Sequence, residues 1–373
     1  MNRQTEISIK AERLQKMLAA KKLGGVLINS QRNFAWLTAG ANNGIDTSRE
    51  NGAASLLVRN DGKKFVLANK IEMPRMLAEE ISAEDFEPAE FAWEEETSSD
   101  FLTNLALSLL NNGGALGADL FTNAQTPIVE NDVAGCRYEL TGTEIERFRR
   151  LGKDAGETLG SLIKTLRGGE SEIEIARRTT DLLAAKNIRS IVTLAAADER
   201  LKKFRHPVPT EKCWEKVLMI VVCAGREGLI ASLSRIVCAG SIPDDLRNRT
   251  DACARVNAAI LAATKPDTTG ADLFNVAAHS YARENFAGEE KLHHQGGAAG
   301  YKTRDWVAHP KSSETVHLNQ AFAWNPSITG TKTEETCIVF ENGIEIITAS
   351  PDYPQIVIEV DGREYLSPDV LSL

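Results

Sequence analysis

Positive charge is scarce in this sequence, and no apolar run is long. Lys and Arg number 43 against 52 Asp and Glu, which gives a net charge of −9 at pH 7. Because a surface of this sign repels phosphate, nucleic acid is not an expected partner. The longest strongly apolar stretch, Val217–Gly225, is far short of the roughly 20 residues that span a bilayer, so no membrane partner is expected. The opening residues, MNRQTEISIKAER, lack a signal peptide's apolar region, and we expect a cytoplasmic protein.

Paired cysteine motifs are also lacking. The sequence contains six cysteines and no CxxC pair. This scatter favours neither a disulfide framework nor a zinc knuckle, and reduced thiols are expected. The cysteines are Cys136, Cys213, Cys223, Cys238, Cys253 and Cys337.

The N-terminal third has the pattern of a small α/β domain. With 373 residues, the chain exceeds the range of about 100–200 residues for one domain, so two domains are expected. Apolar spacing predicts a helix over Ile9–Lys22, and a buried strand follows at Gly24–Ile28. Asp61-Gly62 is typical of a hairpin turn. The strands that it would join are Ala54–Val58 and Lys64–Ala68, and the further expected elements are helices at Glu72–Ile81 and Asp100–Asn111 and a strand at Ala115–Asp119.

The pattern of charged and apolar residues changes after residue 140, where a charged helix is predicted to follow Leu140-Thr141-Gly142-Thr143. We therefore predict two domains, at residues 1–140 and 141–373. Capping-box patterns at Ser171 and Thr269 predict further amphipathic helices. The expected strands are Val217–Cys223, Leu229–Cys238, Ala321–Asn325, Cys337–Glu341, Glu345–Ala349 and Gln355–Glu359, with Gly343 in a hairpin turn. Strands grouped around helices without regular βαβ alternation indicate an α+β fold.

Most residues capable of chemistry fall in four segments of the C-terminal half. Each segment joins strand-like sequence to His, Arg, Asn or Glu, the residue types that a polar pocket needs. The segments are FRHPVPT (Phe204–Thr210), VVCAGREGLIASLSRIV (Val221–Val237), HHQGGAAGYKTRDWVAHP (His293–Pro310) and QAFAWNPSITGTKTEET (Gln320–Thr336).

The order of these segments resembles the pita-bread family, peptidase family M24, which includes creatinase, prolidase, aminopeptidase P and methionine aminopeptidase. The N-terminal third resembles the creatinase/prolidase N-terminal domain. The resemblance therefore covers nearly the whole chain, and implies a creatinase/prolidase-like α/β domain followed by a pita-bread α+β catalytic domain.

Metal-dependent members of this family bind two metal ions through two Asp, one His and two Glu. In this sequence the resemblance places four of the five ligand positions on residues that are not carboxylate or imidazole, namely Cys223, Ser232, Gly297 and Asn325. The last position keeps Glu334, or Glu335 under a one-residue shift. One anionic ligand cannot hold two hard ions, so neither a metal nor another cofactor is expected. A thiolate at Cys223 with Glu334 and a histidine is the alternative, a one-zinc site, whereas the favoured interpretation of Cys223 is a small apolar strand residue.

Creatinase provides a metal-free precedent, because it cleaves a guanidinium C–N bond with histidine and glutamate. The resemblance places its proton-shuttling histidine on His206. Imidazole has an ordinary pKa near 6.5, so it accepts and returns protons near neutral pH. We therefore predict His206, His293 and Glu334 as the catalytic residues. The alternative for His206 is a structural histidine beside Pro207.

His293 and His294 are adjacent, so in a strand their side chains would face opposite sides. We expect His293 to enter the pocket, and His294 is kept as a substrate-binding candidate.

Three further residues are predicted to bind substrate. Arg235 and Arg304 are candidate carboxylate clamps, because a guanidinium offers two parallel donors. For Arg235 a structural ion pair with Glu334 or another acid is the alternative. Asn325 is the third predicted substrate contact.

The leading functional prediction is a metal-independent hydrolase of a C–N bond in a small amino-acid-like or amidine-like substrate. A metal-dependent Xaa-Pro-type aminopeptidase or dipeptidase and a catalytically silent peptide-binding module are the alternatives. The expected partners are a small-molecule or short-peptide substrate and, because the resemblance implies it, a second copy of the chain in a homodimer.

Overall fold

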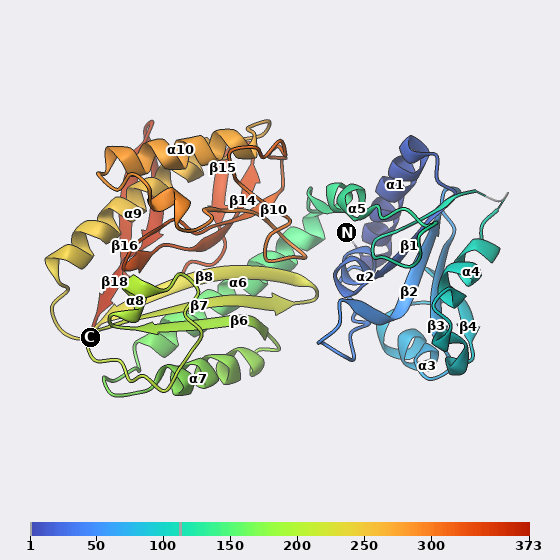
Figure 1. The fold of residues 1–373 in the computed structure, drawn as a ribbon, viewed down its shortest axis with the longest axis horizontal. Helices are drawn as coiled ribbons and strands as arrows, with labels where there is room; N and C mark the ends of the chain where they lie inside the picture. The colour runs from blue at the N-terminus through green and yellow to red at the C-terminus, as the bar shows by residue number, and fades with distance from the viewer. Residues whose placement is uncertain (1, 112–113) are drawn as a thin grey trace. The chain divides into compact units, whose positions relative to one another are not determined.

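The computed structural model describes residues 2–111 and 114–373 of the chain. It divides the chain into two compact units, Met1–Glu144 and Ile145–Leu373 (Figure 1). The domain boundary predicted from the sequence lies between residues 140 and 141, just before the helix α6 (Gly142–Ile163). Among the described residues, no helix is both long enough and apolar enough to cross a membrane.

Unit 1 is built on a mixed five-stranded sheet with the order β4-β3-β2-β1-β5. The β2–β3 pair is antiparallel, which confirms the predicted hairpin. Its turn is stabilised because Asp61 accepts a 3.1 Å hydrogen bond from the backbone N–H of Lys63. The strands are β1 (Gly25–Ser30), β2 (Asn51–Arg59), β3 (Lys64–Asn69), β4 (Glu87–Phe91) and β5 (Leu116–Ala118).

Helices accompany this sheet, and α4 (Phe101–Ser108) packs through Ala106 against the apolar residues of β1 to β5. The first helix begins at Arg3 rather than at the predicted Ile9, because the side chain of Asn2 caps its N-terminus. The predicted helix at Glu72–Ile81 is a short α-helical turn followed by a π-helical turn. Besides α4, the helical elements of unit 1 are α1 (Arg3–Lys21), α2 (Gln31–Leu37), α3 (Met73–Arg75), the π-turn η1 (Met76–Glu80), the 3₁₀ turn η2 (Trp93–Thr97) and α5 (Glu130–Arg137).

Unit 2 contains two principal sheets. One has the order β18-β8-β7-β6, and the other has the order β10-β9-β11-β14-β15. The sheets meet where Thr336 of β14 accepts a hydrogen bond from the backbone N–H of Ser232 on β8. The strands of the two sheets are β6 (Arg189–Ala197), β7 (Val217–Arg226), β8 (Leu229–Cys238), β9 (Gly296–Ala299), β10 (Trp306–Val307), β11 (Ala321–Trp324), β14 (Glu335–Phe340), β15 (Gly343–Ile346) and β18 (Val370–Ser372).

Helices lie on both sides of these strands, with α9 and α10 on one side and α7 on the other (Figure 1). The predicted capping boxes at Ser171 and Thr269 are both formed. The other elements are α7 (Glu172–Ala184), α8 (Arg200–Lys203), α9 (Asp244–Ala263), α10 (Gly270–Arg283), the 3₁₀ turn η3 (Glu289–Lys291) and the short strands β12 (Ser327–Ile328), β13 (Thr331–Lys332), β16 (Gln355–Val360) and β17 (Arg363–Pro368).

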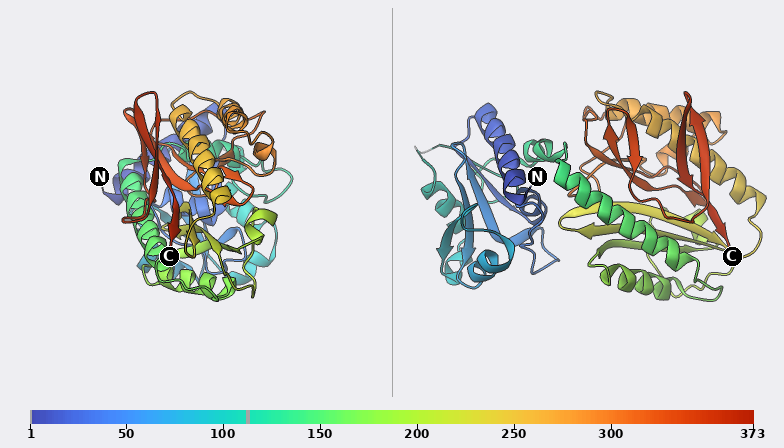
Figure 2. Two further views of the ribbon diagram at one scale, coloured as in Figure 1. Left: turned by 90° about the vertical axis from the view of Figure 1, so that its left-hand side faces the viewer. Right: turned by 180° about the vertical axis from the view of Figure 1, so that it is seen from behind.

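The long helix α6 runs in front of the strands of unit 2 when the molecule is seen from behind (Figure 2, right). It approaches the segment after β15 closely, because a Cβ atom at Gly156 would lie 2.5 Å from the carbonyl oxygen of Thr348. The same segment was predicted as a strand at Glu345–Ala349. In the structure the strand ends at Ile346, and the chain beyond it packs on α6 instead.

Candidate functional site

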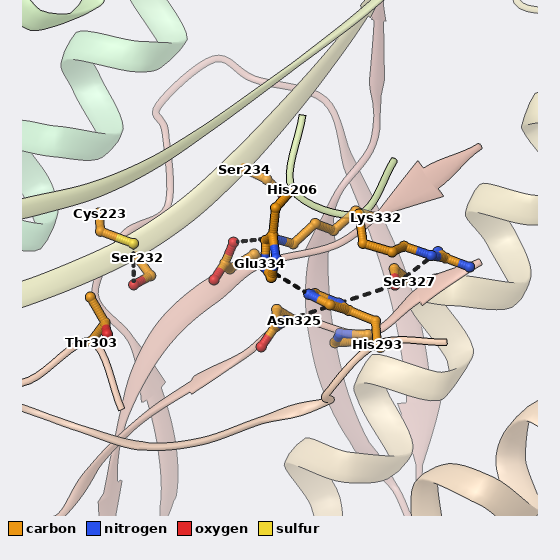
Figure 3. Close-up of polar contacts among 12 residues, drawn as sticks. His206, Cys223, Ser232, Ser234, His293, Thr303, Asn325, Ser327, Lys332 and Glu334 are labelled. Carbon is orange, nitrogen blue, oxygen red and sulfur yellow. Dashed lines mark hydrogen bonds and ion pairs between the residues drawn. The ribbon is translucent and has the colours of Figure 1, made fainter. Parts of the chain in front are cut away.

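Three histidines from two separate loops of unit 2 gather in one cluster, which we call the histidine cluster. His206 follows α8, whereas His293 and His294 lie between η3 and β9. Figure 3 shows His206 and His293 pointing toward one another, and their Nε2 atoms are 3.2 Å apart. His206 is exposed and His293 is buried, so the cluster reaches solvent on the side of His206.

The expectation that only one of the adjacent histidines enters the site is wrong. His293 and His294 precede β9 and have no strand geometry, so their side chains do not alternate. Their ring centroids are 4.5 Å apart, and the His294 ring is 6.1 Å from that of His206. Strand periodicity does not apply to a loop, and both side chains join the cluster.

A chain of hydrogen bonds leads from Arg304 to His206. Arg304 Nη2 donates to Asn325 Oδ1 at 2.9 Å. Asn325 Nδ2 lies 3.3 Å from His293 Nδ1 and donates at 3.1 Å to the carbonyl of His294. Because the amide orientation is fixed by these partners, His293 accepts at Nδ1 and donates from Nε2 to His206. The buried Asn325 therefore orients an imidazole, in place of the predicted substrate contact.

The environment keeps these imidazoles neutral. Burial, followed by the positive charge of Lys332, lowers the pKa of His293 to about 2 and that of His206 below its ordinary value. Burial and then Arg304 lower the pKa of His294 to about 4. A neutral imidazole has a free lone pair, so His206 can accept a proton at neutral pH.

Glu334, which follows β13 in the chain, is held between two cations. Its Oε1 atom is 2.9 Å from Arg304 Nη2, and its Oε2 atom is 2.7 Å from Lys332 Nζ. Burial by itself would raise the pKa of Glu334, but the charges of Lys332 and Arg304 lower it overall. Sequence reasoning missed Lys332, although it lies in the same segment as Glu334 and only two residues before it.

The positions that the resemblance assigns to metal ligands do come together. Cys223 and Ser232 face each other across β7 and β8, and the Ser232 hydroxyl donates at 3.3 Å to the Cys223 sulfur. Arg304 contacts Ser232, Asn325 and Glu334 at once. A guanidinium thus lies among residues at three of the five ligand positions.

These residues do not fit a pair of divalent ions. Glu334 is already neutralised by two fixed cations, which would repel further positive charge. No side chain fits at Gly297, because a Cβ atom there would lie 2.0 Å from the carbonyl oxygen of Trp306. The thiol of Cys223 is not a ready ligand either, since burial, followed by the negative charge of Glu334, raises its pKa.

One other group has the spacing of metal ligands. Within residues 2–111 and 114–373, only His206, His293 and His294 form such a group, with ligand atoms within 4.8 Å of one another. Three neutral imidazoles can hold one transition-metal ion. The alternative zinc site at Cys223 and Glu334 does not have this spacing.

The predicted carboxylate clamps do not have the expected geometry. Arg235 is fully buried away from the histidine cluster, where it pairs with Glu335 at 2.9 Å and donates to Ser350 and the carbonyl of Thr348. Its guanidinium therefore has a structural ion pair, the alternative interpretation. Arg304 lies in the site, but its Nη atoms are occupied within the protein. The adjacent glutamates thus pair with different arginines, Glu334 with Arg304 and Glu335 with Arg235.

Comparison with known proteins identifies the class to which this fold and site belong. Residues 146–348 match metallopeptidase family M24, and residues 10–150 match the creatinase/prolidase N-terminal domain. The chain belongs to the M24 family, and its fold is the two-domain pita-bread type, as the sequence predicted. No curated protein matches the chain.

Solved structures share this fold over nearly the full length. A prolidase from Thermococcus sibiricus has a TM-score of 0.79 at 14% identity, covering 100% of both chains. The Xaa-Pro dipeptidase from Bacillus anthracis has a TM-score of 0.74 at 16% identity and covers 98% of this chain and 99% of its own. The N-terminal domain of FACT complex subunit SPT16 from Cicer arietinum has a TM-score of 0.70 at 10% identity, covering 93% and 96%. At these identities the likeness establishes the fold alone.

Proposed function

We propose that this protein hydrolyses a C–N bond in a small amino-acid-like or amidine-like substrate, without a pair of metal ions and with His206 as the general base. One observation supports this most strongly: the exposed, neutral imidazole of His206 is in hydrogen-bond contact with His293. The cations on Glu334 supply positive charge where relatives of this family bind metal.

The chemistry requires only water and this imidazole. In the site without substrate, the Nε2 lone pair of His206 accepts a hydrogen bond from the N–H of His293. A water molecule that replaces this donor would donate its hydrogen bond to the same lone pair. His206 removes a proton as the water oxygen bonds to the carbonyl or amidine carbon. The C–N bond then breaks, and the imidazolium returns the proton to the leaving nitrogen.

A substrate screen tests the proposal. Small amides, ureas, amidines and dipeptides are incubated with the protein, and released ammonia or amine is measured with and without a chelator. We expect turnover that survives chelation and is lost in His206→Asn. Turnover that disappears on chelation and returns with added metal would overturn the metal-independent mechanism, including one based on a metal held by the histidine cluster.

Cleavage of short peptides of the Xaa-Pro type is the second candidate, because several similar structures are named as prolidases or Xaa-Pro dipeptidases. Elemental analysis of the purified protein distinguishes it. About one or two tightly bound ions per chain, with release of proline from dipeptides, would favour this candidate. Saturable peptide binding without any turnover would instead indicate a silent binding module.

We also propose that the protein acts as a homodimer, as the resemblance to two-domain members of the family implies. Light scattering should give a mass near twice 40.7 kDa. A monomer across micromolar concentrations would contradict this proposal without bearing on the chemistry of His206.

A further inference from the structure

A pocket in unit 1 has no part in the chemistry proposed for His206. It has a volume of about 510 Å³ and is lined by residues of β1, β2, β3 and α4 and of the segment after β5; we call it the unit 1 pocket. The strands β1, β3 and β5 run in the same direction, and the pocket residues lie toward or beyond their carboxyl ends. Ligands of open α/β sheets commonly bind at this end of the strands.

Polar residues replace apolar ones where the sheet reaches this pocket. Leu27 of β1 and Leu57 of β2 pack in the apolar core that α4 covers. Two positions from them, the same strands carry Asn29 and Ser55, which line the pocket. The pocket therefore begins where the apolar core of unit 1 ends.

Three buried oxygen atoms of the unit 1 pocket have no hydrogen-bond partner in the described part of the chain. They are Asn29 Oδ1, Thr103 Oγ1 and Thr122 Oγ1, which come from β1, from α4 and from the segment after β5. Asn29 is only 6% exposed and Thr103 only 1% exposed, so these two form the floor of the pocket. Buried polar atoms are nearly always paired, and unpaired atoms from three separate elements indicate a place that a ligand completes.

The charge of the unit 1 pocket is negative. Glu50 and Glu96 line it, and none of its described lining residues is Lys, Arg or His. Glu50 forms an ion pair with Arg32. Glu96 accepts a 2.6 Å hydrogen bond from the amide of Asn69, but no cation of the described chain pairs with it. Because the charge of Glu96 is not balanced within the protein, this pocket favours a cation over an anion.

We infer that the unit 1 pocket binds a primary ammonium ion that carries a short alkyl chain. An ammonium group has three donors and no acceptor, so it satisfies unpaired oxygen atoms such as Asn29 Oδ1 while Glu96 balances its charge. The alkyl chain has apolar contacts available at Leu102 and at Phe121, which is 71% exposed. Covering Phe121 removes apolar surface from water and favours binding. All of these residues belong to unit 1, so the inference does not rest on the proposed function.

The experiment titrates the full chain with n-butylammonium chloride near neutral pH and follows binding by isothermal titration calorimetry. Butan-1-ol is the neutral match of this probe, and butyltrimethylammonium keeps the charge but has no N–H donor. We expect saturable one-to-one binding of butylammonium, weaker binding of butyltrimethylammonium and no binding of butan-1-ol. Equal binding of butylammonium and butan-1-ol, or no saturable binding of butylammonium, would overturn the inference.

Two variants locate the binding at the floor of the pocket. Asn29→Leu and Thr103→Val nearly keep the size of each side chain and remove the unpaired oxygen atom. Each should weaken butylammonium binding about 10- to 100-fold, the contribution of a hydrogen bond to a charged group. The ligand-free protein should be as stable as the wild type or more stable, because these oxygen atoms make no hydrogen bond among the described residues. Unchanged binding in both variants, or a clear loss of stability in both without ligand, would assign these side chains a structural role and overturn the inference.

Glu96→Gln tests the charge by itself. Glu96 is exposed, so removing its charge should weaken butylammonium binding by only about 2- to 5-fold, the range of an exposed ion pair. The matched control Glu94→Gln removes the charge of another exposed glutamate that does not line the pocket, and binding should stay unchanged. An equal effect of the two variants would overturn the pairing of the ammonium with Glu96. None of these outcomes bears on turnover by His206, which the substrate screen tests separately.

Discussion

Two buried polar networks, one in each unit, differ in what balances their charged groups. In unit 1 the carboxylate of Asp119 accepts hydrogen bonds from the backbone N–H groups of Asn29 and Ser30, from the Ser30 hydroxyl and from the amide of Asn33, all between 2.6 and 3.1 Å. These bonds tie the end of β1 and the start of α2 to the segment after β5. The carboxylate has a structural role because the protein itself supplies all four of these donors.

The histidine cluster of unit 2 is built differently. Its imidazoles are held neutral beside an excess of positive charge, and polar atoms of His294 and Arg304 have no partner among the described residues. Charge left unbalanced and atoms left unpaired reduce stability and are retained where a ligand compensates. Unpaired atoms alone do not distinguish the two, because Asn29 Oδ1 in unit 1 also lacks a partner within the described chain. The comparison teaches that cations in excess beside neutral imidazoles, more than the presence of buried polar residues, mark the candidate site.

The largest expected effect is on turnover. His206→Asn should lower kcat by about 10²- to 10⁴-fold, because proton transfer in the transition state is lost, with a smaller change in KM. The first substrate from the screen provides the assay, and circular dichroism checks the fold. Normal turnover in this variant would mean that the cluster is as structural as the Asp119 network.

Arg235→Met should cost about 3–5 kcal/mol in the free energy of unfolding, because it leaves the buried Glu335 without its cation. Denaturant unfolding monitored by circular dichroism measures the loss. The effect should fall on stability and not on the KM of the substrate, since Arg235 contacts Glu335, Ser350 and Thr348 and not the histidine cluster. If stability holds while the KM of a carboxylate-bearing substrate rises strongly, Arg235 is the predicted carboxylate clamp after all.

Asp119→Asn should cost about 1–3 kcal/mol, because donors that now point at a carboxylate would meet an amide NH₂. Chemical denaturation with the same probe gives the difference. The histidine resonances should keep their wild-type positions. A variant as stable as the wild type would contradict the structural role of the Asp119 network.

Two buried groups, His293 and Glu335, should make the free energy of unfolding depend on pH in opposite directions. The pKa of His293 is about 2 when folded and about 6.5 when unfolded, so below pH 6.5 the unfolded state binds more protons and stability falls as pH falls. Burial raises the pKa of Glu335 to about 7, so for this group stability falls as pH rises from about 4.5 to 7. Each slope is at most about 1.4 kcal/mol per pH unit.

Unfolding curves across pH 4.5–7 for His293→Gln and Glu335→Gln test these signs. Relative to the wild type, the first variant should gain stability as pH falls and the second as pH rises. Differences of the reverse sign would contradict the assigned environments, in which Lys332, Arg304 and Arg205 face the imidazoles and Arg235 faces Glu335.

The smallest effect is expected for Cys223→Ala. The thiol is buried and its pKa is raised, so it is a packed apolar group whose removal should cost about 1 kcal/mol of stability and little turnover. Collapse of activity here, with normal turnover in His206→Asn, would reverse the assignment and point to thiolate or cysteine-bound metal chemistry.

Much of the fold was predictable because its signals are local. The capping boxes of α7 and α10 and the Asp61-Gly62 hairpin depend on residues a few positions apart. The two short helical turns in place of a helix at Glu72–Ile81 and the early end of β15 were missed. In the second case the packing of α6 on the following segment decided the strand end, and no local pattern records that contact.

By itself, the sequence determined the family, the order of the four segments and the absence of most metal-ligand side chains, since these follow from which residues stand at which positions. Only the tertiary structure decided the pairing of charges. His206 and His293 are 87 residues apart, and Arg304 is 30 residues from Glu334. Which buried acid meets which cation depends on the faces that loops and strands present to one another. For that reason Lys332, the Arg235–Glu335 pair and the shared orientation of His293 and His294 emerged only from the folded chain.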